Sequence, residues 1–134
     1  MDKNQHPAMI AAHNSWKAVM NRDREAWFAL MADEIRIEDP IGVAPTNPSG
    51  EGFCGLEEIN QFWDTNIGLT ESITIEAEQS YAAGSESAHI LHLTTTFPGG
   101  AKMHIQGIFT YRVNDEGKLT NLRGYWSLDE ARSE

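Results

Sequence analysis

The sequence predicts an α+β fold in which a curved antiparallel sheet wraps around helices from the first half of the chain. Apolar residues recur at helical spacing through much of residues 7–66, whereas apolar and polar residues alternate from residue 73 to about residue 128. The long strands of the second half are joined by tight turns, which is typical of an antiparallel meander. A twisted sheet that curls around helices leaves space between the two layers, so we expect an apolar cavity.

Composition and charge limit the possible partners and location. We expect the 134 residues to form a single domain, spanning 1–134, that needs no metal or disulfide for its core. The formal net charge of −10 argues against nucleic acid and anionic membranes as partners, since both bind basic surfaces. Cys54 is the only cysteine, which fits a reducing cytoplasm. The chain start lacks the apolar core of a signal peptide, and no stretch approaches the ~20 apolar residues of a membrane helix.

Helices are expected in the first half of the chain. The first is predicted at Pro7–Met20, because its apolar residues form one stripe and Pro is favoured in a first turn. Asp23 is a plausible N-cap for a second helix through residue 32. A third helix is predicted at residues 56–66, before Gly68, a residue type that commonly ends helices.

A short strand is expected directly after the second helix, because apolar and charged residues alternate there. This alternation places Ile35, Ile37 and Asp39 on the buried face. The neighbouring side chains of Arg36 and Glu38 should then face solvent. The proline that follows ends the strand and leaves the Asp39 carboxylate at its tip.

Asp39 is therefore the candidate catalytic residue. A carboxylate on an apolar face costs free energy unless it is paired, hydrogen-bonded or used in chemistry. The alternative is an Asp-Pro turn whose carboxylate caps nearby amides. The loop that follows, residues 40–55, is long for a compact domain, and such loops often form the rim or lid of a functional site.

The end of this strand also carries the most specific motif of the chain, Glu-Asp-Pro-Ile-Gly at residues 38–42. Together with Asp23 between the first helices and a late Asn-x-x-Gly-Lys turn at residues 114–118, it resembles the ketosteroid isomerase-like branch of the nuclear transport factor 2-like (SnoaL-like) superfamily. The likeness covers about residues 8–128. It implies a cone-shaped fold with an apolar cavity for a flat steroid. In that family an Asp base moves a proton, while a Tyr and a protonated Asp stabilise the dienolate oxygen.

Only part of the family's catalytic set has a matching residue type in this sequence. Asp39 matches the family base, but the family Tyr falls on Ser15 and the second Asp falls near Phe109. Steroid isomerase activity is therefore expected to be weak or absent. Replacement donors remain open; Tyr111 and Trp126 lie at strand positions suited to line the cavity. Other groups able to donate into it are His13, Ser15, Trp16, Tyr81 and His104.

The ligand-binding residues are expected on the helices and on the last strands. They are aromatic residues and one serine, and each aromatic has a purely structural role in the core as its alternative. The set comprises Ser15, Trp16, Phe62, Trp63, Phe109, Tyr111 and Trp126. No cofactor or metal is expected. His89, His92 and His104 lie on neighbouring strands, as the ligands of a metal site could. However, His89 and His92 are three positions apart on one strand and so face opposite sides of it.

Several functions remain open at this level. Asp39 could move a proton next to a carbonyl of a steroid-like substrate, or the cavity could bind a small apolar ligand without turnover. A third possibility is another enzyme of the superfamily acting on a hydrophobic substrate, such as a dehydratase, a cyclase or an epoxide hydrolase; the last would need Arg123 paired with Asp39 or Asp115. A homodimer is expected through the open sheet face, where we place Leu91, Leu93, Ile108 and Tyr125.

Overall fold

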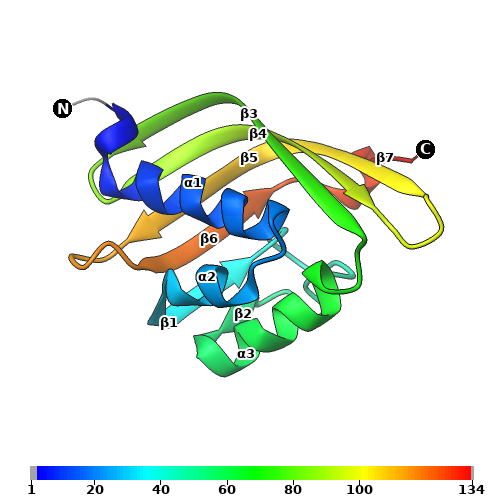
Figure 1. The fold of residues 1–134 in the computed structure, drawn as a ribbon, viewed down its shortest axis with the longest axis horizontal. Helices are drawn as coiled ribbons and strands as arrows, with labels where there is room; N and C mark the ends of the chain where they lie inside the picture. The colour runs from blue at the N-terminus through cyan, green and yellow to red at the C-terminus, as the bar shows by residue number, and fades with distance from the viewer. Residues whose placement is uncertain (1–2, 134) are drawn as a thin grey trace.

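The computed structural model describes residues 3–133 and has the predicted α+β architecture (Figure 1). The termini of the expected 1–134 domain, residues 1, 2 and 134, lie outside the described range. The α-helices are α1 (Pro7–Met20), α2 (Arg24–Ala29) and α3 (Gly55–Phe62). The strands are β1 (Met31–Glu38), β2 (Phe53–Cys54), β3 (Ser72–Ala83), β4 (Glu86–Thr96), β5 (Lys102–Val113), β6 (Leu119–Tyr125) and β7 (Arg132–Ser133).

The strands form one curved sheet with the order β2-β1-β6-β5-β4-β3, and β7 pairs with β5. Strands β3 to β6 form the predicted antiparallel meander. Strand β1 pairs in parallel with β6, so the first long strand and the last long strand lie side by side. In Figure 1, α1 crosses in front of β4, β5 and β6, and α3 lies below it on the same side. This arrangement leaves the concave side of the sheet facing the helices.

The helix ends follow local hydrogen bonds. His6 caps α1 by accepting from the Ala8 amide at 3.1 Å, and Asp23 caps α2 as predicted, by accepting from the Ala26 amide at 3.1 Å. Helix α2 ends at Ala29 rather than at residue 32, because Met31 already pairs with β6. Helix α3 continues as a π-helical turn over residues 63–67 before Gly68.

The core lies between the helices and the concave face of the sheet. Its fully buried side chains include Trp27, Ile35, Ile37, Ile59 and Leu119. The prediction that Ile35 and Ile37 face inward is therefore confirmed.

The expected composition of the outer sheet face was partly wrong. Leu91 is 1% exposed, and both Leu91 and Leu93 line the inner cavity, because they alternate inward with the buried residues of β4. Ile108 and Tyr125 do face outward, with 48% and 50% of their surface exposed.

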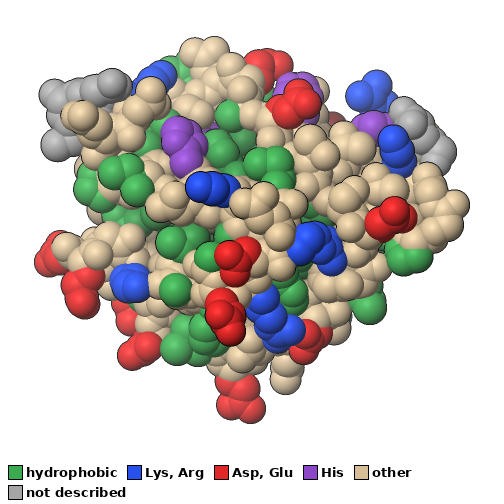
Figure 2. Space-filling model, in the orientation of Figure 1, with side chains coloured by type: hydrophobic (Ala, Val, Ile, Leu, Met, Phe, Trp, Pro, Cys, Tyr) green, Lys and Arg blue, Asp and Glu red, His purple; other side chains and the backbone are tan. Residues whose placement is uncertain are grey.

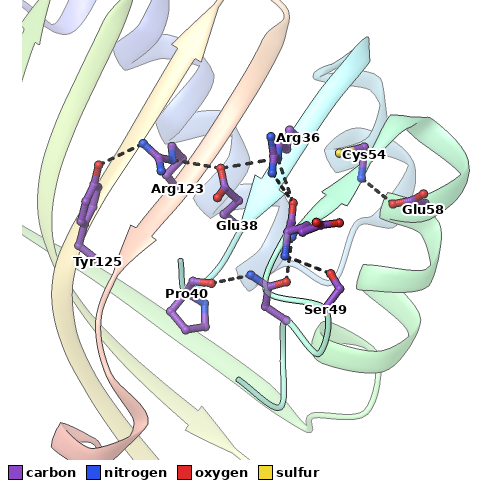
Figure 3. A network of polar contacts seen from close by, with 11 residues as sticks. Arg36, Glu38, Pro40, Ser49, Cys54, Glu58, Arg123 and Tyr125 are labelled. Atoms are coloured by element: carbon purple, nitrogen blue, oxygen red, sulfur yellow. Dashed lines mark hydrogen bonds and ion pairs between the residues drawn. The ribbon is translucent and has the colours of Figure 1, made fainter. Parts of the chain in front are cut away.

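The expectation that Glu38 faces solvent was also wrong. It is 9% exposed and accepts a 3.1 Å hydrogen bond from Nε of Arg123, its register partner on β6 (Figure 3). Arg36 Nε lies 3.7 Å from the same Glu38 oxygen. Gly52 also packs closely over Glu38, since a Cβ at that glycine would lie 2.8 Å from Glu38 Cγ. A polar cluster of β1 and β6 thus occupies the side of the sheet opposite the helices.

The surface is predominantly acidic, as the net charge of −10 requires. In the view of Figure 2, Asp and Glu side chains lie over the lower part of the molecule, where α2 and α3 lie in Figure 1. Within residues 3–133, no helix is both long enough and apolar enough to cross a membrane.

Candidate active site

A cavity of about 510 Å³ lies between the helices and the concave face of the sheet. It is lined mainly by apolar side chains from α1, from α3 and its extension, and from β3 to β6. Its volume falls in the ordinary range for small-molecule sites. Among its lining residues, Leu69 and Leu128 are 65% and 45% exposed, so the cavity opens to solvent beside them, whereas Leu91 and Phe109 are buried.

Asp39 is the only ionisable carboxyl group among the lining residues in the described chain. It directly follows β1 and continues the inward-facing series of Ile35 and Ile37. Burial raises the pKa of the Asp39 carboxyl from 3.8 to about 6, because the apolar surroundings disfavour the charged form. The indole Nε1 of Trp126 donates a 2.6 Å hydrogen bond to Asp39 Oδ1, which favours the anion and partly opposes that rise. The predicted opening of this carboxylate into an apolar cavity is confirmed.

The backbone after Asp39 is held by the long loop. Thr46 Oγ1 donates to the Asp39 carbonyl at 2.6 Å, and Asn47 Nδ2 donates to the Pro40 carbonyl at 2.9 Å. The buried Asn47 side chain also accepts from the Gly52 amide at 2.9 Å. Because Thr46 also lines the cavity, the loop both holds the backbone of Asp39 and forms part of the cavity wall.

Two glycines on neighbouring strands make room for the Asp39–Trp126 pair. A Cβ at Gly124 would lie 2.7 Å from Asp39 Oδ1, 2.9 Å from the Phe109 ring and 3.1 Å from the Trp126 ring. A Cβ at Gly107 would lie 2.9 Å from Trp126 Cβ. Glycine within a strand often marks such a close approach.

Tyr111 and Trp16 form the second polar pair of the cavity. Trp16, on α1, donates from Nε1 to the Tyr111 hydroxyl oxygen at 2.8 Å, and both residues line the cavity. Burial, reinforced by the nearby Asp39 charge, raises the pKa of the Tyr111 hydroxyl well above its ordinary value, although the bond from Trp16 opposes this. Tyr111 therefore stays protonated at all physiological pH values.

The remaining predicted ligand-binding residues divide into two groups. Ser15, Phe62 and Phe109 line the cavity. Trp63 does not: its ring centroid lies 5.2 Å from that of Trp27, in the core, and its ligand-binding role stays a prediction. Phe62 ends α3 and Trp63 begins the π-helical turn, and of these two consecutive residues only Phe62 lines the cavity.

The histidines do not assemble into a metal site. His89 is buried on the inner face between the hydroxyls of Ser80 and Ser87, each 2.7 Å from one of its ring nitrogens. His92 lies on the other face, 3.0 Å from a carboxylate oxygen of Glu78. No cluster of His, Cys, Asp and Glu side chains suited to a metal ion occurs within residues 3–133.

Sequence reasoning missed several residues that shape this site. Trp126 was expected as a ligand contact or donor, and its indole donates a hydrogen bond to Asp39. Gly124, Gly107 and the buried Asn47 were not identified at all. Only the two glycines carried a signal, since each interrupts a strand pattern.

Comparisons with known proteins identify the family of this chain and proteins of the same fold. The chain matches the SnoaL-like domain family over residues 12–122 and belongs to that family. A structure of Rv0760c from Mycobacterium tuberculosis has 46% sequence identity and a TM-score of 0.93, and the match covers 97% of this chain and 98% of that one. The same protein in complex with estradiol-17β-hemisuccinate has 47% identity and a TM-score of 0.91, with 96% and 99% covered.

A Δ5-3-ketosteroid isomerase from Mycobacterium sp. is equally similar. It has 46% identity and a TM-score of 0.92, and the match covers 96% of this chain and 99% of the isomerase. An epoxide hydrolase of the limonene-epoxide-hydrolase-like type from M. tuberculosis has only 15% identity, with a TM-score of 0.76 and 92% and 85% covered, and shows the shared fold alone. The site thus lies in a ketosteroid isomerase-like member of the SnoaL-like, NTF2-like fold.

Proposed function

We propose that this protein binds a flat, steroid-like ligand in its cavity and that Asp39 is a general base able to remove a proton next to a ligand carbonyl. The observation that carries the proposal is the Asp39 carboxylate, which opens into an apolar cavity of about 510 Å³. The estradiol-17β-hemisuccinate complex of Rv0760c supports a steroid-like ligand, since that protein is 47% identical to this chain.

The protonation of Asp39 suits this role. With a pKa of about 6, the carboxylate is mostly ionised at neutral pH and is a stronger base than an ordinary aspartate. Trp126 keeps one of its oxygens hydrogen-bonded. The other oxygen, Oδ2, has no hydrogen-bond partner among residues 3–133 and can approach a carbon-bound proton.

We further propose that isomerisation of a Δ5-3-ketosteroid is slow or absent. The positions that match the two family oxyanion donors hold Ser15 and Phe109, and Phe109 has no group that can donate. Losing one such donor typically costs about 2.7–4 kcal/mol, or a hundred- to a thousandfold in rate. A protein that sequesters its ligand without turnover is therefore the second candidate.

The epoxide-hydrolase alternative has less support. Such a site would need Arg123 beside Asp39, but the Arg123 guanidinium binds Glu38 on the opposite side of the sheet (Figure 3). Asp115 lies in the turn after β5 and does not line the cavity.

The test combines binding and turnover. Calorimetry should detect binding of a phenolic steroid, and a dienone absorbance assay should show turnover of a Δ5-3-ketosteroid far below that of an authentic isomerase run in parallel. Asp39→Asn should abolish any turnover and keep the binding. Turnover equal to the authentic isomerase would contradict the missing-donor argument, and the lack of any steroid binding would reject both candidate functions.

We also propose a cytoplasmic homodimer. The exposed side chains of Ile108 and Tyr125 on the outer sheet face support self-association, because together they form an apolar area between adjacent strands β5 and β6. The exposed free thiol of Cys54 suits a reducing compartment. Sedimentation at micromolar concentration should show the dimer, and Ile108→Lys should convert it to a monomer.

A further inference from the structure

The cavity offers few groups that can donate a hydrogen bond to a ligand. Trp126 Nε1 is engaged by Asp39, and Trp16 Nε1 is engaged by Tyr111. His104 does not line the cavity and contacts Thr94 Oγ1 at 3.1 Å. The hydroxyls of Thr46, Thr65 and Thr70 donate to backbone carbonyls, which leaves the buried hydroxyls of Tyr111, Ser15 and Thr95.

The Tyr111 hydroxyl is held in a donating orientation. Its oxygen accepts the 2.8 Å hydrogen bond from Trp16, so its own proton must point elsewhere. No residue within 3–133 accepts that proton, although Tyr111 is only 4% exposed. A buried donor without an acceptor costs free energy, and a ligand oxygen in the adjoining cavity would satisfy it.

Trp16 is in turn held by a neutral buried histidine. The rings of Trp16 and His89 form a T-shaped pair with 4.8 Å between centroids, and His89 forms a second such pair with Tyr111 at 5.4 Å. Ser87 Oγ donates to the Ala8 carbonyl at 3.3 Å, so it accepts from His89 Nε2, and Nδ1 is left to accept from Ser80. Every hydrogen bond of His89 is thus assigned with the imidazole uncharged.

From this arrangement we infer that the Tyr111 hydroxyl, oriented by Trp16, binds the acceptor oxygen of the cavity ligand. The inference rests on the proposed function and specifies the ligand further: an apolar skeleton that enters with a carbonyl or similar oxygen first. Tyr111 thereby supplies a donor from β5, whereas the two positions that match the family donors hold Ser15 and Phe109. Trp16 is a positioning residue in this scheme.

The test compares two saturated steroids that differ only in a 3-keto group. A ketone oxygen accepts hydrogen bonds and cannot donate them, so its contribution to affinity reports a donor in the cavity. Calorimetric titration of the wild type should show tighter binding of the ketone. Tyr111→Phe should reduce the affinity for the ketone roughly three- to tenfold, the usual range for one hydrogen bond, and leave the oxygen-free steroid within about twofold. Tyr81→Phe, at a 60% exposed tyrosine, is the matched control and should change neither.

Infrared spectroscopy gives a readout that altered packing alone would not move. In the wild type, the carbonyl band of the bound ketone should lie at lower frequency than in an apolar solvent, and Tyr111→Phe should return it toward the solvent value. Trp16→Phe should retain part of the shift with a broader band, because the hydroxyl then loses its fixed orientation. Tyr111→Phe alone leaves the Trp16 indole without its acceptor. The double variant with Tyr111→Phe and Trp16→Phe removes both groups, and it should bind the ketone and the oxygen-free steroid with equal affinity.

The possible failures are distinguishable. Equal wild-type binding of both steroids would overturn the inference while the proposed steroid binding stands. An unchanged ketone preference in Tyr111→Phe, with the preference lost in Ser15→Ala, would assign the donor to Ser15 and also overturn it. Binding of neither steroid would overturn both this inference and the proposed function.

Discussion

The indole Nε1 of Trp126 lies 2.6 Å from Oδ1 of Asp39, across 87 positions of sequence. This bond favours the ionised carboxylate, whereas burial favours the protonated acid. The balance places the pKa of Asp39 at about 6, close to neutral pH. Any proton transfer by this protein should therefore depend on both effects.

The first prediction concerns the pH profile. Any Asp39-dependent turnover or proton exchange from a bound ketone should rise as the pH increases through about 6, because the base must be ionised. Trp126→Phe removes the bond to the anion and should move the midpoint to higher pH. Hydrogen–deuterium exchange of the ligand, followed by NMR, measures this even when isomerisation is undetectable. A midpoint near pH 4 would contradict the burial of the carboxyl group.

The second prediction concerns stability. The pKa of Asp39 is raised from 3.8 to about 6 on folding, so its contribution to stability is fully present below pH 4 and is lost as the pH rises through about 6. Asp39→Asn cannot ionise, and it should be more stable than the wild type at pH 8 by roughly 1–3 kcal/mol. Urea denaturation at pH 8 measures the difference. An Asn variant less stable than the wild type at that pH would refute it.

The third prediction uses His89 as the opposing group. Burial, reinforced by His13, lowers the pKa of His89 from 6.5 to about 4, so folding loses stability as the pH falls from about 6.5 to 4. In the wild type, the Asp39 contribution to the free energy of unfolding increases as the pH falls over nearly the same interval, so the Asp39 and His89 effects oppose each other. Asp39→Asn should therefore lose stability between pH 7 and pH 4.5 more steeply than the wild type. Thermal unfolding across this pH range tests it. Parallel curves would show that the pKa of Asp39 is not raised, and an Asp39→Asn curve that does not fall with pH would show that the pKa of His89 is not lowered.

The fourth prediction concerns Gly124. In Gly124→Ala, the new methyl group would lie 2.7 Å from Asp39 Oδ1, so the carboxylate or the Phe109 ring must move. Overpacking of this kind typically costs about 1–3 kcal/mol. We also expect at least tenfold weaker steroid binding, because the displaced groups line the cavity. Gly84→Ala is the control: Gly84 has a positive φ of 58°, so alanine is strained there, but it is remote from the cavity and should leave binding unchanged.

Local patterns predicted the parts of the site that depend on neighbours in sequence. Alternation along β1 correctly placed Asp39 on the same side as Ile35 and Ile37. Alternation along β5 likewise placed Phe109 and Tyr111 inward. The errors arose where tertiary pairing decides the environment. Glu38 is buried because β6 brings Arg123 beside it, and a single-strand pattern cannot reveal that pairing.

The environments of Leu91, Leu93 and Trp63 also depend on tertiary packing that local sequence patterns do not reveal. Leu91 and Leu93 were expected on the outer face, but they line the cavity between the sheet and the helices, and alternation within β4 does not show which face the helices cover. Trp63 was expected as a ligand contact, but its ring packs against that of Trp27 in the core. The Trp126–Asp39 and Trp16–Tyr111 bonds join distant segments, so no local signal encodes either partner.

The parallel pairing of β1 with β6 has a consequence for the order of assembly. During synthesis, β1 emerges long before Leu119–Tyr125, the strand that must lie beside it. Contacts between such distant segments form slowly, because a long loop has to close first. Until then Ile35 and Ile37 have only their local neighbours, and the Asp39 carboxylate is hydrated and has an ordinary acidity. The raised pKa of Asp39 therefore requires that the C-terminal part of the sheet is in place, and titration of Asp39 near pH 6 would report that the cone has closed.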